Sequence, residues 1–410
     1  MEPEIYPKEQ HGIEINQIDS KALYILEKLR AARHEAYLVG GSVRDLLLHK
    51  KPKDFDISTS ARPEEIKALF SNCILIGKRF RLAHIRFGRK VIEVSTFRAG
   101  DTENEELITE DNIWGSPEKD ALRRDFTING LFYDSANETI IDYVGGYHDI
   151  KKKYLRAIGQ PYLRFKQDPV RMIRCLKFQA RFGLEIDRDA ELAMIDCKKE
   201  IKKSAQARVL EELLRMLESG SASPFFKLMT DHGILQQLLP TIASFLETPE
   251  GDEIYSFLTE ADLTVHEPHQ PRLERPVLIS CLVFPIVEKG LKTHFLDRER
   301  IPHIGEIFQE INVIIDSIFN IFFRLPRKLR VSTVDLLVSQ YRMTPFEKKK
   351  KRKIRIPNIP DFYLSLQFLQ LRARLEPSLQ IIAETWGKLY EEKQDHEPET
   401  HPITRYKKRS

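Results

Sequence analysis

Apolar and polar positions follow two different periodicities along the chain, and the first part mixes strands with helices. Residues 20–33 carry apolar side chains at helical spacing, with Ser20 as the expected N-cap, which predicts an amphipathic helix. From there to about residue 158, short apolar runs alternate with turn residues, a pattern typical of strands. The predicted strands are 36–39, 55–57, 73–76, 83–87, 91–96, 140–143 and 154–158, and the predicted helices among them are 43–49, 63–70 and 128–131. We therefore expect an α/β domain with a mixed sheet and flanking helices.

Beyond Pro161 the apolar spacing is helical, and Pro or Gly separates many of the segments. The predicted helices are 170–182, 190–201, 209–217, 224–229, 253–261, 276–287, 307–323, 331–340 and 362–375. The remainder is therefore expected to be all-α. The predicted divisions are a disordered N-terminal segment at 1–19, an α/β domain at 20–160, a helical neck at 161–235, a helical body at 236–345, and a basic C-terminal region with a disordered tail at 346–410.

Length and composition narrow the class of protein. A chain of 410 residues exceeds what one hydrophobic core usually serves, and 41% hydrophobic with 31% charged residues is a globular balance. The longest apolar stretches, at 277–287 and 311–323, are too short and too polar to span a bilayer. Residues 1–17 are polar and acidic, unlike a secretory leader, so we expect a cytoplasmic protein. The four cysteines are widely scattered, which argues against a structural zinc site or a disulfide scaffold.

Positive charge is concentrated near the C-terminus, although the formal net charge is only +4. Blocks of this kind bind phosphates without regard to sequence when they are functional, and otherwise form solvated loops. The pattern alone leaves both interpretations open. The first block consists of Lys348, Lys349, Lys350, Lys351, Arg352, Lys353 and Arg355, and the second of Arg405, Lys407, Lys408 and Arg409.

A pair of acids is the sharpest local feature. Asp54 and Asp56 flank one aromatic residue in a predicted strand, where side chains two positions apart point to the same face. Divalent cations relieve the repulsion between such carboxylates, and Mg²⁺ prefers these oxygen ligands. Two-metal nucleotidyl transfer requires such a pair, although the same residues also occur in exposed turns. Glu93, in the strand predicted at 91–96, either places a third acid nearby or faces solvent.

A glycine turn precedes these acids. The strand predicted at 36–39 leads through Gly40 and Gly41 into a helix whose first turn presents Ser42 and Arg44. Backbone N–H groups at such a turn bind phosphate oxygens, glycine allows close approach, and arginine adds positive charge. The alternative is an ordinary turn between a strand and a helix.

A charged block follows the polar loop in the middle of the α/β region. Arg123, Arg124 and Asp125 lead into the helix predicted at 128–131, and Asn129 lies one turn later. Closely spaced arginines and an acid suit the sugar and triphosphate of a nucleotide. Helix capping by Asp125, with solvated arginines, is the alternative.

The last block opens the helical region. Asp168 stands before a proline, as an N-cap does, and Arg171 and Arg174 follow in the helix. Asp168 and Arg171 share a helical face, and an acceptor beside a forked donor suits the Watson–Crick edge of a base. A plain ion pair between positions i and i+3 is the alternative.

These blocks, in this order from residue 37 to residue 217, resemble those of the bacterial class II nucleotidyltransferases. That family comprises the CCA-adding tRNA enzymes and the poly(A) polymerases of the DNA polymerase beta-like superfamily. The resemblance implies an α/β nucleotidyltransferase head followed by all-α neck and body domains. It implies metal ligation by Asp54 and Asp56, with Asp125 as a further catalytic residue. The nucleotide-binding residues are expected to be Gly40, Gly41, Ser42, Arg44, Arg124, Asn129, Asp168, Arg171 and Arg174.

One departure and three likenesses bear on the branch of the family. Gln167 stands where the family usually has Glu, which places a supporting contact in question. The segments 75–82, 207–212 and 362–390 resemble the poly(A) polymerase forms, and no signature of an HD phosphohydrolase is visible. The poly(A) polymerase branch is therefore favoured.

This resemblance implies an enzyme that adds AMP from ATP to RNA 3′ ends, without a template, with two Mg²⁺ ions. The block at 348–355 is then expected to bind RNA through its phosphates. CCA addition to tRNA is the alternative enzyme, and an RNA-binding module with a relic head is the alternative without catalysis.

Overall fold

The computed structural model describes residues 2–77, 82–100, 113–268, 271–347, 356–357 and 361–396. The chain forms two compact units, Met1–Ser204 and Ala205–Ser410. The first unit contains every predicted site residue up to Arg174, and the second contains the predicted body and the C-terminal region.

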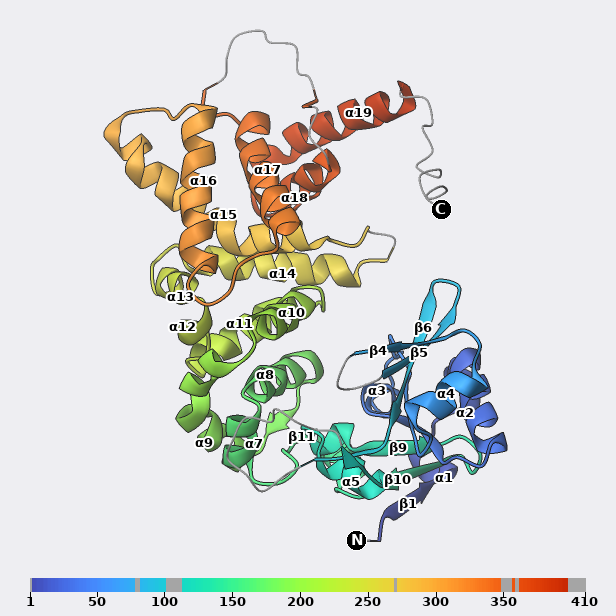
Figure 1. Cartoon of the computed structure of the whole chain (residues 1–410). Helices are drawn as coiled ribbons and strands as arrows, with labels where there is room; N and C mark the ends of the chain where they lie inside the picture. The colour runs from blue at the N-terminus through green and yellow to red at the C-terminus, as the bar shows by residue number, and fades with distance from the viewer. Residues whose placement is uncertain are drawn as a thin grey trace. The chain divides into compact units, whose positions relative to one another are not determined.

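The first unit is built on an eight-stranded mixed sheet (Figure 1). The strand order is β1-β10-β9-β2-β3-β6-β5-β4, in which β3 and β6 are parallel and the other neighbours antiparallel. The predicted α/β class is thereby confirmed. The strands are β1 (Glu4–Pro7), β2 (Ala36–Val39), β3 (Asp56–Thr59), β4 (Cys73–Ile76), β5 (Leu82–Phe87), β6 (Lys90–Thr96), β9 (Leu131–Asp134) and β10 (Thr139–Asp142).

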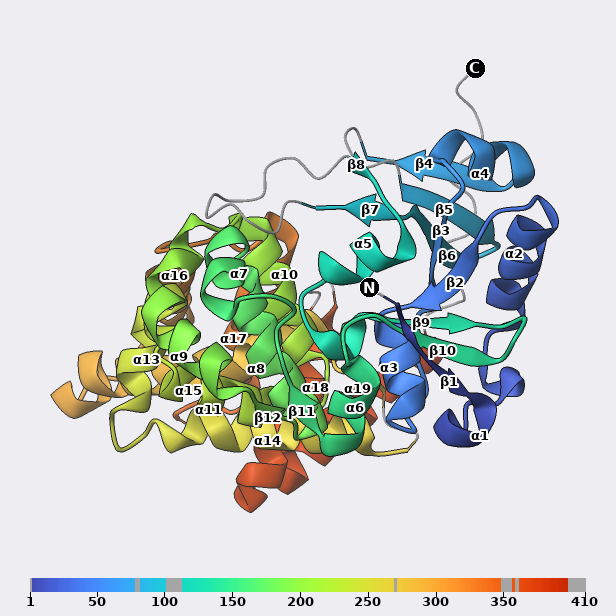
Figure 2. The ribbon, with the colours of Figure 1, turned by 90° about the horizontal axis from the view of Figure 1, so that it is seen from below.

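The early helices of the first unit pack on the sheet, and the later ones follow it along the chain. Helices α2 and α4 lie next to each other beside the β2–β5 part of the sheet (Figures 1 and 2). Asp19, rather than Ser20, caps α2, since its side chain accepts a hydrogen bond from the Lys21 amide. The helices are α1 (Lys8–His11), α2 (Ser20–Ala31), α3 (Gly41–Leu47), α4 (Pro63–Leu69), α5 (Pro117–Leu122), α6 (Gly146–Lys152), α7 (Pro161–Gln167), α8 (Val170–Phe182) and α9 (Arg188–Cys197).

The N-terminal segment predicted to be disordered is ordered. Strand β1 pairs with β10, and the Tyr6 ring stacks on Tyr147 with centroids 4.0 Å apart. The Tyr147 hydroxyl donates a hydrogen bond to the Gln10 carbonyl, and Ile13 is buried. The prediction was wrong because backbone pairing with β10 orders this polar segment, and a pairing partner far along the chain leaves no local pattern in the sequence.

Two further predictions in this unit are corrected. The helix expected at 128–131 is only a 3-10 turn, Thr127–Asn129, followed by strand β9, because the apolar run there is buried on both faces of the sheet. The strand expected at 154–158 is reduced to β11 (Tyr154–Leu155), which pairs with β12 (Glu185–Ile186) outside the main sheet. A second small sheet joins β7 (Arg98–Ala99) to β8 (Ile113–Trp114).

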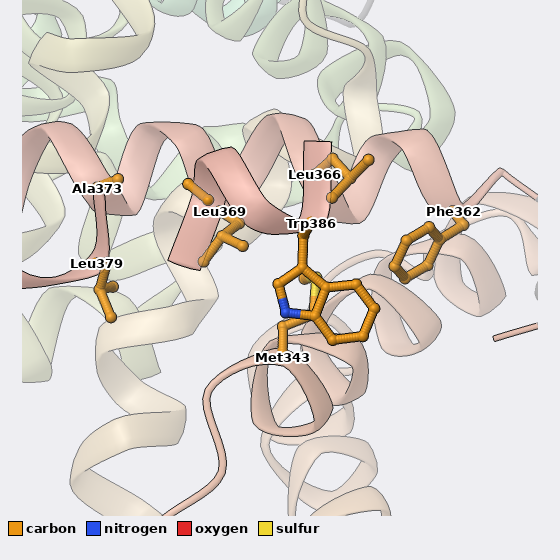
Figure 3. Packing of buried hydrophobic residues seen from close by; sticks show 8 residues of the cluster. Met343, Phe362, Leu366, Leu369, Ala373, Leu379 and Trp386 are labelled. Atoms are coloured by element: carbon orange, nitrogen blue, oxygen red, sulfur yellow. The ribbon is translucent and has the colours of Figure 1, made fainter. Parts of the chain in front are cut away.

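In the second unit the described residues form helices only, as expected for the chain beyond Pro161. The short strand β12 in the first unit is an exception to that expectation. One core packs Trp386 against Met343, Phe362 and Leu366 (Figure 3). Across the described parts of the chain, no helix is long and apolar enough to cross a membrane. The helices are α10 (Gln206–Leu217), α11 (Ala222–Asp231), α12 (Leu235–Leu238), α13 (Pro240–Leu246), α14 (Asp252–His266), α15 (Arg275–His294), α16 (Ile304–Phe319), α17 (Arg327–Met343), α18 (Phe362–Leu375) and α19 (Gln380–His396).

Candidate active site

The paired acids lie where β3 begins. Asp56 is the first residue of this strand, and Asp54 lies just before it rather than within it, so the strand spacing predicted for the pair does not hold. Asp54 is exposed and Asp56 is half-buried. Since Ile57 pairs with Val94 across the parallel ladder, Glu93 is the neighbour of Asp56 on β6.

Negative charge accumulates at this edge. Burial and the Glu93 carboxylate, with a smaller effect from Asp54, raise the pKa of Asp56 to about 6 against the opposing charge of Arg124. Glu93 itself lies 3.3 Å from His84, measured from Oε1 to Nε2. The Glu93 carboxylate is therefore near Asp56 and is also exposed to solvent, so each of the two interpretations of the sequence holds in part.

The carboxylates of Asp54 and Asp56 suit a cation that takes its remaining ligands from water and substrate. In the described residues, no group of three or more His, Cys, Asp or Glu side chains is arranged to hold a metal ion. Mg²⁺ usually takes one or two carboxylates and completes its shell with water and substrate phosphates. Asp54 and Asp56 supply such a pair, and a cation there would favour the ionised form of Asp56, whose pKa is raised first by burial and then by Glu93.

The backbone of the glycine turn lies against the Arg124 side chain. Gly40 has φ of +66°, and a Cβ built there would lie 2.9 Å from Arg124 Nη1, so a side chain at this position would be strained and would displace the arginine. Ser42 is buried, and its hydroxyl donates to the Val39 carbonyl at 3.1 Å. Gly41 begins α3. The turn is therefore closed by its own residues and lies directly against Arg124.

Arg44 is buried at the centre of the unit instead of extending from the turn. Its guanidinium donates two hydrogen bonds to Asp45 Oδ1, at 2.9 and 2.6 Å, and one to Asn129 Oδ1 at 2.7 Å. It also lies over the rings of Phe178 and Phe182 on α8. Burial lowers the pKa of Arg44, and Asp45 opposes that effect. In this arrangement Arg44 ties the glycine turn to α8, and its contact with a triphosphate stays a prediction.

Asp125 is the next link in this chain of polar contacts. Its Oδ1 accepts from the Phe126 amide at 2.8 Å and from Asn129 Nδ2 at 3.0 Å, and its Oδ2 accepts from Arg174 Nη1 at 3.3 Å. Burial alone would raise the pKa of Asp125, but the Arg174 charge and the Asn129 amide lower it to about 2. Asp125 is therefore ionised at neutral pH. Hydrogen bonds run from Arg44 through Asn129 and Asp125 to Arg174, and they join three of the sequence blocks.

Arg124 lies between the acids and the glycine turn. Its Nη2 donates to Asp120 Oδ2 at 2.8 Å and to Ser58 Oγ at 3.4 Å, and its Nη1 donates to the Asn129 carbonyl at 3.3 Å. Asp120 is fully buried and also accepts from Arg123. Sequence reasoning missed Asp120, although its i, i+4 spacing to Arg124 on a helix was a usable signal.

Asp168 and Arg171 form the pair expected at the start of α8. Arg171 Nε lies 3.8 Å from Asp168 Oδ2, and Arg171 Nη2 donates to the Arg123 carbonyl at 3.2 Å. We expected Asp168 to be the N-cap of α8. The N-cap is instead Pro169, one residue later. Arg171 is buried and Asp168 is half-buried.

The predicted RNA-binding block is not among the residues that the structure describes. Lys348, Lys349, Lys350, Lys351, Arg352, Lys353 and Arg355 lie outside the described residues, as do residues 78–81 of the branch-specific segment and the basic residues near the C-terminus.

Comparison with known proteins gives concordant matches. Residues 36–156 match the family described as "Poly A polymerase head domain", and residues 183–246 match "Probable RNA and SrmB- binding site of polymerase A". Poly(A) polymerase I of Escherichia coli O6:H1 is 36% identical over 402 residues, covering 93% of this chain and 85% of that protein. A CCA-adding enzyme of Staphylococcus saprophyticus is 37% identical over 212 residues, covering 52% of this chain and 53% of that protein.

A solved structure extends the likeness to the fold. The Bacillus stearothermophilus CCA-adding enzyme in complex with CTP has a TM-score of 0.62 at 22% identity, and the match covers 90% of this chain and 82% of that chain. At this identity the likeness concerns the fold alone. The match to the poly(A) polymerase head and the identity with poly(A) polymerase I define the class as nucleotidyltransferase, and the mixed sheet with its helical remainder agrees with the fold of the solved structure. The chain belongs to the poly(A) polymerase family, and it is a template-independent RNA nucleotidyltransferase, as the motifs predicted.

Proposed function

We propose that this chain adds AMP from ATP to RNA 3′ ends and releases pyrophosphate. The bond between the RNA 3′ oxygen and the α-phosphorus forms, the bond between the α-phosphorus and the bridging oxygen breaks, and the hydroxyl proton passes to solvent. The observation that carries the proposal is the joining of the predicted blocks into one charged network around Asp125, next to Arg124 and Asp56.

The residues divide into a cation-binding part and a nucleotide-binding part. Two Mg²⁺ ions held by Asp54 and Asp56 would activate the 3′-hydroxyl and neutralise the leaving pyrophosphate. Arg124, with the turn at Gly40, Gly41 and Ser42, would hold the triphosphate. Fixed charges in such a site need no reorganisation during the reaction, and this pre-organisation supplies much of the rate acceleration.

Base selection is proposed for the start of α8. Asp168 offers an acceptor and Arg171 a forked donor, held 3.8 Å apart. Arg171 also donates to the Arg123 carbonyl, which fixes its orientation relative to the nucleotide block. Arg174 is committed to Asp125, and we propose that it orients that carboxylate and does not read the base.

The choice of adenylate addition is supported by the extent of the sequence likeness. The poly(A) polymerase I relative aligns with 93% of the chain, whereas the CCA-adding relative aligns with 52%. CCA addition to tRNA is the second candidate, because that relative is 37% identical over 212 residues.

Primer extension with each nucleotide supplied separately tests the proposal. We expect long runs of AMP on an unstructured RNA and little incorporation of the other three nucleotides. Ordered addition of C, C and A to a tRNA that ends at its discriminator base would instead establish the second candidate. Absence of Mg²⁺-dependent pyrophosphate release with every RNA would favour the non-catalytic RNA-binding module.

A further inference from the structure

Arg164 is a charged residue in the interior of the first unit. It lies on α7, in the helical region that follows the α/β head, and it is 1% exposed. It is among the largest fully buried side chains in the described residues. A buried guanidinium is costly unless hydrogen bonds satisfy it, so its partners indicate what it does.

Its partners are backbone carbonyls of the nucleotide block. Nη2 donates to the Arg123 carbonyl at 2.7 Å and to the Arg124 carbonyl at 2.8 Å, with the Leu122 carbonyl at 3.5 Å. These oxygens lie at the C-terminal end of α5, where carbonyls lack partners within the helix and carry partial negative charge. Arg164 therefore caps α5 from a helix that lies 40 residues further along the chain.

These hydrogen bonds hold the peptide group that sets the positions of the Arg124 and Asp125 side chains. The Arg124 carbonyl belongs to the peptide group that joins Arg124 to Asp125, so fixing it limits rotation on both sides. The Arg124 side chain leaves this point toward Ser58 and Asp120, and the Asp125 side chain leaves it toward Asn129 and Arg174. A shift of this single peptide group would move both charged groups of the proposed site.

We propose that Arg164 is a positioning residue for nucleotidyl transfer, which holds the Arg124–Asp125 peptide group in place. The inference rests on the proposed function, because the group that it positions belongs to the proposed site. Arg164 itself makes no contact with substrate in this scheme. Because the peptide group that it holds carries both Arg124 and Asp125, loss of Arg164 is expected to slow the chemical step and also to weaken ATP binding.

Gln167 also contacts the Arg164 guanidinium. Its Oε1 accepts from Arg164 Nη1 at 3.0 Å, and it is 2% exposed. The resemblance led us to expect Glu at this position, and here the amide oxygen of Gln167 accepts from the Arg164 guanidinium. Because an amide oxygen orients the guanidinium through hydrogen-bond geometry, a carboxylate of the same shape should perform the same task.

The test separates kcat from KM and adds a readout that does not depend on activity. We expect Arg164→Met to lower kcat by about a hundredfold, since misplacement by about 1 Å has that effect, and to raise KM for ATP, since the same shift moves Arg124. Hydrogen exchange of amides in the 122–130 segment should become faster. Gln167→Glu should keep kcat within about threefold of wild type. Arg164→Lys should lower kcat as well, because a single ammonium cannot reproduce the forked donor.

A matched control comes from the second unit. Arg372 is also buried and donates to Gln340 Oε1 and Thr344 Oγ1. We expect Arg372→Met to lower the unfolding temperature but to leave kcat per folded molecule and exchange at 122–130 unchanged. Should Arg164→Met fail to fold, Arg164→Lys carries the same test.

The results distinguish the inference from the function on which it rests. Unchanged kcat and unchanged exchange at 122–130 in the Arg164 variants would overturn the positioning role. Parallel losses in the Arg372 variant would overturn it too, since the effect would then be general destabilisation. If wild-type protein adds no nucleotide to any RNA, the proposed function fails, and the exchange measurement still reports whether Arg164 holds the segment.

Discussion

The side chains of the site hold one another before any substrate arrives. Asn129 accepts from Arg44 through Oδ1 and donates to Asp125 through Nδ2, so a single amide connects the glycine turn to the catalytic block. Asp125 in turn accepts from Arg174 on α8. Because each group has one role in a continuous set of hydrogen bonds, a change at one residue is expected to disturb the others.

The lowered pKa of Asp125 predicts how stability depends on pH. Its side chain is 10% exposed, and its pKa falls from the ordinary 3.8 to about 2. The ionised carboxylate therefore stabilises the fold by roughly 2 kcal/mol above about pH 4, and this contribution is lost as the pH falls toward about 2. In Asp125→Asn this titration is absent. Urea unfolding between pH 5 and pH 3 should show the two proteins converging in free energy of unfolding, and a constant difference would contradict the assignment.

At the scale of elements, the edge strand β1 completes the sheet. It covers β10, and the Tyr6 ring packs on Tyr147 of α6. Without this strand, the backbone groups of β10 would be an open edge. The N-terminal segment is therefore part of the folded head.

A deletion of residues 2–12 tests this role. We expect a lower unfolding temperature and a greater tendency to aggregate, because the deletion removes a strand and exposes its neighbour. Thermal scans with light scattering would measure both. A deletion variant that unfolds and scatters like the full-length chain would mean that the segment contributes nothing to the sheet.

Local patterns predicted most elements and the main site residues, whereas remote pairing was invisible to them. Asp54, Asp56, Asp125 and Arg171 were singled out because their local spacing is itself the signal, and their roles stay predictions. Strand β1 and the role of Arg164 were not found, since the first depends on a strand more than 130 residues away and the second on backbone carbonyls. The position of Asp54 outside β3 also escaped prediction, because strand ends depend on the neighbouring strands.

At the scale of the whole molecule, RNA binding is expected to be electrostatic. The block at 348–355 lies outside the described residues, so its role remains a proposal that rests on its charge. For single-stranded RNA, each phosphate contact that is lost reduces the steepness of log affinity against log salt by about 0.7. This relation allows the contribution of the block to be counted.

Changing Lys348, Lys349, Lys350 and Lys351 to Gln should weaken RNA binding and lower processivity at moderate salt. The salt slope should decrease by up to about 3, which corresponds to the loss of four phosphate contacts. A control variant with Gln at the exposed lysines Lys67, Lys151, Lys152 and Lys292 should bind RNA as wild type does. If processivity and the salt slope are unchanged in the first variant, the block is a solvated surface.

Asp54, just before β3, and Asp56, its first residue, are proposed to hold the catalytic cations. The most direct test is the rate of single AMP addition to a defined RNA, in Mg²⁺, by Asp54→Ala, Asp56→Ala and a control, Asp196→Ala, at an exposed acid of α9. Since loss of one electrostatic group in a pre-organised site costs about a hundredfold or more, both β3 variants should be at least that much slower, and the control should match wild type. RNA ends that grow at the wild-type rate in either β3 variant would contradict the account.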